Sequence, residues 1–70
     1  MSLKNKLKLA RIESNDLTQQ DLARLVGCSR QTIISIESTR FLPSVELAMK
    51  LACVLNKKVE ELFYFDDAEV

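Results

Sequence analysis

The sequence contains no histidine, one glycine and one proline in 70 residues. Without histidine the chain lacks the commonest general base and metal ligand, and one glycine provides no glycine-rich loop for phosphate. No carboxylate pair marks an evident cleft, and 70 residues leave little room for a substrate pocket. We therefore expect no enzyme, no cofactor, no bound metal and no small-molecule ligand.

Cysteine is also scarce. Cys28 and Cys53 are the only two, and two thiols do not supply the four ligands of a structural zinc site. We interpret both as free, buried thiols in a reducing cytoplasm, with redox sensing through Cys28 as the alternative. No apolar run approaches the roughly 20 residues of a membrane span, and the charged N-terminus does not resemble a secretory signal. We therefore expect a cytoplasmic protein without a membrane partner.

What the chain does contain is apolar sequence, with 47% hydrophobic residues, which is typical of a compact helical protein when glycine and proline are rare. We expect one domain, residues 1–70, near the lower size limit for a protein that folds alone. A core of this size leaves little margin of stability. Association of two copies would add to that margin.

The net charge is zero, whereas nucleic-acid-binding domains are usually basic. The charges are unevenly distributed, because residues 1–40 hold seven basic and four acidic side chains and residues 41–70 hold three and six. A nucleic-acid-binding face in the first part would be locally positive. We expect affinity to depend on this arrangement and on dimerisation, with weak non-specific binding.

The segment from Gln19 to Ser38 has the pattern of two short helices joined by a tight turn. Thr18 and Asp21 have the spacing of a capping box, and apolar residues follow at helical intervals. Gly27 suits the end of the first helix, because glycine adopts positive φ without steric penalty. Ser29 can then cap the second helix through its hydroxyl.

This second helix has an apolar face and a polar face. Ile33 and Ile36 are expected to pack against the first helix, and the opposite face carries Arg30, Gln31, Ile34 and Ser35. Arginine and glutamine form bidentate hydrogen bonds with guanine and adenine, and isoleucine can contact a thymine methyl group. The polar face therefore predicts contacts with DNA bases.

The sequence LTQQDLARLVGCSRQTIISIE, residues 17–37, resembles the helix-turn-helix of the phage-repressor-like regulators, the Xre family. The similarity continues through SVELAMKLACVL, residues 44–55, and VEELF, residues 59–63, and so extends over nearly the whole chain. It implies an all-α, five-helix, λ-repressor-like fold with the helix-turn-helix in helices 2 and 3. Double-stranded DNA is the partner that this resemblance implies.

We expect helix 1 from about Lys4 to Ser14, with Leu3, Leu7 and Ala10 facing the core. Helix 4 is expected to follow the proline, and helix 5 to run from Val59 to Phe63. In the loop before helix 4, Phe41 and Leu42 are expected to pack, one or both, between helices 3 and 4.

The resemblance also implies that Arg11, at the end of helix 1, pairs with Glu37, at the end of helix 3. Such a buried pair fixes the angle between helices more than it adds stability. Thr39 stands where the family usually has glycine. Either this loop follows another backbone path or Thr39 is strained at positive φ.

Phosphate contacts are expected from Gln19, Ser29 and Arg40. Gln19 lies in the first turn of helix 2, where free backbone N–H groups favour anions, and the alternative for Gln19 is a solvated polar residue. Basic residues at the position of Arg40 commonly lie along the DNA backbone in the family.

The end of the chain, residues 63–70, combines three aromatic residues with acidic ones. Tyr64 and Phe65, two exposed aromatic residues next to Phe63, are more than a monomer of this size needs on its surface. They favour a dimer interface made of helix 5 and this tail, with Phe63, Tyr64 and Phe65 in it. The alternative is a frayed acidic terminus. Some compact members of the family pair this end with the N-terminus, so a short terminal strand pair is also expected.

Together these features predict a sequence-specific, double-stranded-DNA-binding transcriptional regulator that acts as a homodimer on a pseudo-palindromic operator. The alternative is a protein-binding helical module, such as an antitoxin component. Arg30, Gln31 and Ser35 favour base contact, because protein-binding faces carry more aromatic and aliphatic residues. Ile34 is the residue of that face that suits the alternative.

Overall fold

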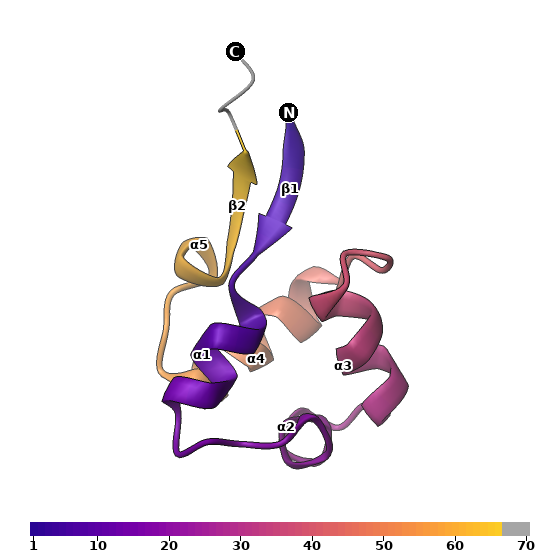
Figure 1. Ribbon diagram of the computed structural model, residues 1–70, viewed down its shortest axis with the longest axis vertical. Coiled ribbons are helices and arrows are strands. Elements are labelled where there is room, and N and C mark those ends of the chain that lie inside the picture. The colour runs from indigo at the N-terminus through magenta and orange to yellow at the C-terminus, as the bar shows by residue number, and fades with distance from the viewer. Residues whose placement is uncertain (67–70) are drawn as a thin grey trace.

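A computed structural model describes residues 1–66, and in this part of the chain there are five helices and two short strands (Figure 1). Their order is β1 (Ser2–Asn5), α1 (Leu7–Glu13), α2 (Gln19–Val26), α3 (Arg30–Glu37), α4 (Val45–Leu55), α5 (Val59–Leu62) and β2 (Phe63–Asp66). The expected five-helix fold with a helix-turn-helix in α2 and α3 and a terminal strand pair is confirmed. Residues 67–70 of the predicted dimerisation tail lie outside the described residues.

Local sequence signals explain how the helix-turn-helix forms. Thr18 Oγ1 accepts a hydrogen bond from the N–H of Asp21 at 2.9 Å, and the Thr18 N–H donates to Asp21 Oδ2 at 3.1 Å, which completes a capping box. Gly27 ends α2 at φ 79. Ser29 Oγ then accepts the N–H of Thr32 at 3.1 Å and caps α3. The turn is therefore fixed by backbone conformation and caps at both sides.

The core lies between the helices, and each of the five contributes to it. Its fully buried large side chains are Leu7, Leu22, Ile33, Ile36, Leu51 and Leu62. Full burial of each such side chain stabilises the fold by roughly 1.5–3 kcal/mol. Ala23 is also fully buried, and a side chain this small allows α2 and α3 to pack closely. The apolar side of α3 is thereby fixed against the core.

The prediction of a helix from Lys4 to Ser14 is wrong at its N-terminal end, because residues 2–5 form β1 and α1 begins at Leu7. β1 pairs antiparallel with β2, and Leu3 lies opposite Phe65 while Asn5 lies opposite Phe63. This pairing joins the two ends of the chain. Helix α5 likewise ends at Leu62, one residue earlier than expected, because Phe63 begins β2.

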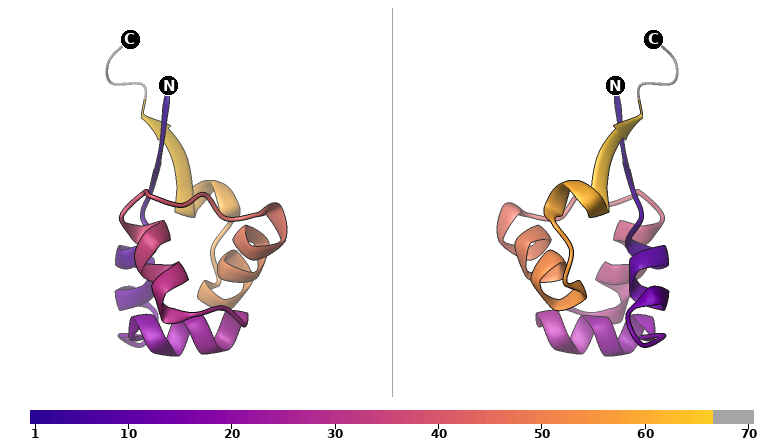
Figure 2. Two further views of the ribbon diagram at one scale, coloured as in Figure 1. Left: turned by 90° about the vertical axis from the view of Figure 1, so that its right-hand side faces the viewer. Right: turned by 90° about the vertical axis from the view of Figure 1, so that its left-hand side faces the viewer.

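The two-stranded sheet extends away from the helices on the side opposite α2 (Figures 1 and 2). The loop between α3 and α4 passes the base of this sheet, as the left panel of Figure 2 shows. A small hollow between them is lined by Leu3, Asn5, Ile36, Phe41, Leu42 and Phe63, among others. The sheet, the end of α3 and this loop are therefore neighbours.

The prediction that Phe41 or Leu42 packs between helices 3 and 4 is wrong, because their exposed fractions are 47% and 64%. Thr39 keeps the left-handed conformation at φ 62, so the strained alternative holds at that position. The Arg40 N–H donates to the Ser35 carbonyl at 2.9 Å. This reversal at the end of α3 turns the following loop towards solvent.

Candidate nucleic-acid interface

The polar side of α3 faces solvent. Arg30 and Gln31 are exposed, and Ile34 and Ser35 are half-buried on the same side of the helix. Gln31 Nε2 lies 3.5 Å from Ser35 Oγ, one turn further along, which is a weak hydrogen bond. The four residues predicted to contact bases thus form one row on α3, exposed at Arg30 and Gln31 and partly covered at Ile34 and Ser35, with Phe41 of the following loop beside Gln31 and Ser35. We call this row the α3 face.

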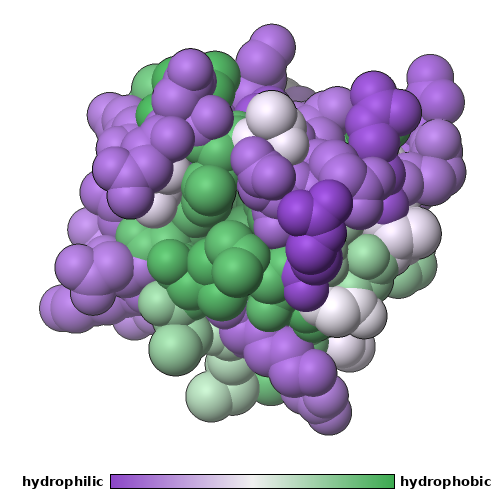
Figure 3. All heavy atoms as spheres, turned by 90° about the horizontal axis from the view of Figure 1, so that it is seen from below, coloured by the Kyte–Doolittle hydropathy of each residue, from purple (hydrophilic) through white to green (hydrophobic). Residues whose placement is uncertain are grey.

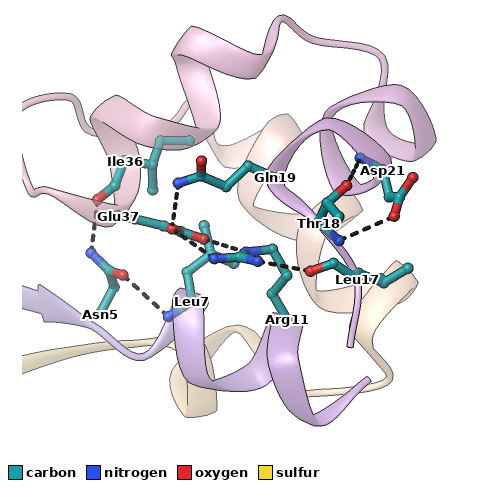
Figure 4. Close-up of polar contacts among 9 residues, drawn as sticks. All are labelled: Asn5, Leu7, Arg11, Leu17, Thr18, Gln19, Asp21, Ile36 and Glu37. Carbon is teal, nitrogen blue, oxygen red and sulfur yellow. Dashed lines mark hydrogen bonds and ion pairs between the residues drawn. The ribbon is translucent and has the colours of Figure 1, made fainter. Parts of the chain in front are cut away.

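A buried ion pair at the end of α3 holds this helix against α1 (Figure 4). Arg11 Nε donates to Glu37 Oε2 at 2.8 Å, and Arg11 Nη2 donates to Oε1 at 3.3 Å. Arg11 Nη1 donates to the Leu17 carbonyl at 2.7 Å. The exposed fractions of the Arg11 and Glu37 side chains are 9% and 7%. Removing one partner of such a pair typically costs about 3–5 kcal/mol, because the other charge stays buried.

The loop after α1 supplies a further hydrogen-bond partner for Arg11. Asn15 and Asp16 both have positive φ, at 58° and 53°, so the chain turns sharply before Leu17. This turn brings the Leu17 carbonyl to the Arg11 guanidinium. Asparagine and aspartate adopt this conformation more readily than most residues do.

Gln19 is hydrogen-bonded to the Arg11–Glu37 ion pair. Its Nε2 donates to Glu37 Oε1 at 3.0 Å, and the residue is half-buried. Glu37 therefore fixes the amide plane of Gln19 at the start of α2, and one Nε2 hydrogen and the amide oxygen are left for other partners. This bond between α2 and the end of α3 was not predicted, because it depends on how the helices meet.

The other two expected phosphate ligands lie at the ends of α3. Ser29 Oγ accepts the Thr32 N–H and lies 2.9 Å from Thr32 Oγ1, so its hydroxyl takes part in the cap. Arg40 follows α3 and is exposed. Both residues are accessible, and they flank the α3 face at its start and its end.

The three aromatic residues predicted at a dimer interface do not share one face of the sheet. Phe63 and Phe65 lie opposite Asn5 and Leu3, on one face, and Phe63 also packs against the core. Tyr64 lies on the other face, because neighbouring strand residues point to opposite sides. There the Lys6 ammonium is 5.4 Å from the centre of the Tyr64 ring.

The two cysteines are free thiols that differ in exposure. Cys28 is half-buried and burial raises the pKa of its thiol, so less of the reactive thiolate is present. Cys53 is exposed, so the prediction of a buried thiol is wrong there. In residues 1–66 no group of three or more acidic or cysteine side chains is arranged to hold a metal ion. No helix of this described part has the length and apolar character needed to cross a membrane.

The end of the molecule that α2 forms has a mixed surface. Figure 3 views this end and shows an apolar area surrounded by hydrophilic side chains. Leu25 of α2 contributes exposed apolar surface, with 58% of its area accessible.

Comparison with known proteins agrees with this geometry. A family model described as helix-turn-helix matches residues 7–62, which extend from α1 to α5. An uncharacterised HTH-type transcriptional regulator of Methanocaldococcus jannaschii is 49% identical over 67 residues, which are 96% of this chain and 100% of that protein. Another from Archaeoglobus fulgidus is 40% identical over 68 residues, 97% of this chain and 94% of that one.

A solved structure shows the same architecture. The crystal structure of a Bacteroides fragilis protein, assigned provisionally as DNA-binding, superimposes with a TM-score of 0.80 at 28% sequence identity. The match covers 90% of this chain and all of that one. With a family model matched over most of its length and relatives aligned almost from end to end, this chain belongs to the Xre-like helix-turn-helix family.

Proposed function

We propose that this protein is a sequence-specific regulator of transcription that binds double-stranded DNA as a homodimer. The observation that carries the proposal is the α3 face, a row of accessible side chains on a helix whose other side is buried. The relatives are named as HTH-type transcriptional regulators, and these names support the same function.

In this proposal α3 enters the major groove. Arg30 and Gln31 lie on its first turn, where side chains reach base edges when a recognition helix docks. Arg30 would donate two hydrogen bonds to a guanine and Gln31 would pair with an adenine. Ile34 and Ser35, one turn further along, would contact a thymine methyl group and a neighbouring base.

Phosphate contacts on both sides of α3 would fix its register. Arg40 would bind a phosphate as an exposed cation, and the Ser29 hydroxyl would donate its hydrogen to another. Gln19 would use the Nε2 hydrogen that Glu37 leaves free. The buried Glu37 would thus orient the Gln19 amide for a phosphate contact, and it would also fix the angle of α3.

Two copies would meet through one face of the sheet and the adjoining loop. Phe65 is 54% exposed and lies opposite Leu3, which lines the small hollow with Phe41 and Leu42. Phe41 and Leu42 are 47% and 64% exposed. Together with Leu3 and Phe63 they form an apolar surface, which we call the sheet–loop surface. We leave Tyr64 out of the proposed interface, because it lies on the opposite face of the sheet against Lys6.

The proposal is tested by selection of bound sites from random duplex DNA. A homodimer with one recognition helix in each of two successive major grooves should enrich a pseudo-palindrome with half-sites about 34–36 Å apart. Enrichment of a single half-site would contradict the homodimer and leave base readout intact. If no sequence is enriched, DNA readout is contradicted.

The second candidate, a protein-binding helical module, has one observation in its favour. The sheet–loop surface and Leu25 are more exposed apolar area than DNA contact requires. A partner protein would have to cover one of them. Failure of the selection together with a stable heteromeric complex would favour this candidate.

A further inference from the structure

The side chain of Asn5 joins the sheet to the end of the recognition helix. Asn5 Nδ2 donates to the Ile36 carbonyl at 2.9 Å, across 31 positions of sequence. Its Oδ1 accepts the Leu7 N–H at 3.1 Å (Figure 4). Asn5 therefore bonds to the start of α1 and to the last turn of α3 at once, while its backbone belongs to β1.

Both groups bonded to Asn5 lie at helix ends. The Leu7 N–H belongs to the first turn of α1, where intrahelical partners are lacking. The Ile36 carbonyl belongs to the last turn of α3 and also accepts the Thr39 N–H at 2.9 Å, so Asn5 is its second donor. Asn5 is half-buried and pairs with Phe63 of β2. The next residue continues the attachment, because the Lys6 N–H donates to the Leu62 carbonyl at 2.8 Å. The base of the sheet is thus held against α3 and α5.

The position of this bond links two parts of the proposed function. The sheet–loop surface includes Leu3 of β1 and Phe63 and Phe65 of β2, and α3 carries the base-reading residues. In a homodimer joined through that surface, the angle between the sheet and α3 determines how far apart the two α3 helices lie. A side chain that fixes this angle therefore affects which operators fit.

We infer that Asn5 is a positioning residue that sets the half-site separation which the dimer prefers. The inference rests on the proposed function, because it needs a homodimer that reads two half-sites. Asn5 itself contacts no base, since its partner Ile36 is on the buried side of α3, with an exposed fraction of 1%. Its effect on DNA binding is exerted through the direction of α3.

Two substitutions separate the two hydrogen bonds of Asn5. Asn5→Asp keeps an acceptor for the Leu7 N–H and replaces the donor that faces the Ile36 carbonyl with a second oxygen, which repels that carbonyl. Asn5→Ser also keeps an acceptor for Leu7 but is too short to reach Ile36. Ser2→Ala is the matched control, because it changes the far end of β1 and leaves both partners of Asn5 in place.

The experiment measures affinity for duplexes that carry two inverted copies of the selected half-site. Their centre-to-centre separation is varied from about 8 to 13 base pairs, around the ~10 of one helical turn. Wild type and Ser2→Ala should share one preferred separation. Asn5→Asp and Asn5→Ser should reduce the preference for it by about 3- to 10-fold, the effect of one net hydrogen bond. Affinity for a single half-site should stay within about twofold.

The outcomes separate the inference from the proposed function. If both Asn5 variants give the separation profile of wild type, the inference is overturned and the proposed function stands. If they weaken the single half-site as much as the paired one, Asn5 only stabilises the fold, which also overturns it. If wild type itself shows no preferred separation, the homodimeric operator is contradicted and the inference falls with it.

Discussion

Arg30 and Arg40 carry the same charge near the two ends of α3, and both are exposed. The proposed function gives them different tasks, since Arg30 would read a base and Arg40 would bind a phosphate. A bidentate contact with guanine distinguishes one base pair from another, whereas a phosphate contact carries no sequence information. The two residues are therefore matched probes, because each loses one positive charge on substitution by alanine.

Arg30→Ala is expected to reduce affinity for the selected operator by about 1–3 kcal/mol and to relax the preference at one base pair. Arg40→Ala is expected to weaken binding to operator and random duplexes alike, and to reduce the salt slope by about 1. Titrations of both variants at several salt concentrations measure these effects. Equal losses on operator and random DNA for Arg30→Ala would contradict base readout.

Thr39 is a β-branched residue at φ 62, a conformation that costs residues other than glycine about 1–2 kcal/mol. Thr39→Gly should therefore raise the free energy of unfolding by about 1 kcal/mol, although glycine adds entropy to the unfolded chain. Asn56, at φ 55, ends α4 in the same conformation. Asparagine tolerates it better, so Asn56→Gly is a matched control that should gain less. Urea unfolding of both variants compares the gains, and equal gains would argue against strain at Thr39.

At the scale of elements, α2 depends on its capping box. The hydrogen bond from the Thr18 backbone N–H lowers the pKa of Asp21 below its ordinary value of 3.8, and the Thr18 side chain and the charge of Arg24 act in the same direction. Near pH 4 the unfolded chain therefore binds more protons than the folded one at this residue. The ionised carboxylate stabilises the fold at neutral pH, and this contribution disappears as the pH falls through the lowered pKa.

Asp21→Asn is expected to be less stable than wild type from about pH 5 to pH 7, because it removes the charged cap from the positive end of α2. Between about pH 4 and pH 2 the difference should shrink, since protonation removes the same charge from wild type. Urea unfolding of both proteins across this range measures the difference. A difference that is constant down to pH 2 would show that the charge of Asp21 is not its cause.

The elements that sequence analysis predicted well are those with local signals. Thr18, Gly27 and Ser29 act on neighbours a few residues away, so the bounds of α2 and α3 follow from the sequence alone. The helical spacing of Leu3, Leu7 and Ala10 predicts helix where β1 lies, because the partner that makes residues 2–5 a strand is β2, residues 63–66, near the other end of the sequence.

The same difference between local and distant contacts applies to the candidate site. The α3 face follows from helical periodicity, and the Arg11–Glu37 pair was implied by the family resemblance. The bonds of Gln19 to Glu37 and of Asn5 to Ile36 join residues far apart in sequence. No sequence pattern near Gln19 or Asn5 indicates such a partner, so these contacts can be identified only from the structure.

At the scale of the whole molecule, the sheet extends from the helices and has two different faces (Figure 1). One face carries Leu3 and Phe65, and Leu3 lines a small hollow with the exposed loop residues Phe41 and Leu42. The other face carries Tyr64, whose ring centre lies 5.4 Å from the Lys6 ammonium. An isologous interface places the same patch on both subunits, so each side chain in it counts twice. The unpaired apolar face is therefore the better candidate for self-association.

Phe65→Ser should raise the dissociation constant of the dimer by about 10- to 100-fold. Full burial of a phenylalanine contributes roughly 1.5–3 kcal/mol, Phe65 is 54% exposed before association, and burial of that exposed half is lost from both subunits. Tyr64→Ser, the same change at the adjacent position, should leave the constant nearly unchanged, because Tyr64 lies on the opposite face. Sedimentation velocity over a range of concentrations measures both. If Tyr64→Ser dissociates the dimer and Phe65→Ser does not, the subunits meet on the Lys6 side of the sheet, and Phe41 and Leu42 have no part in the interface.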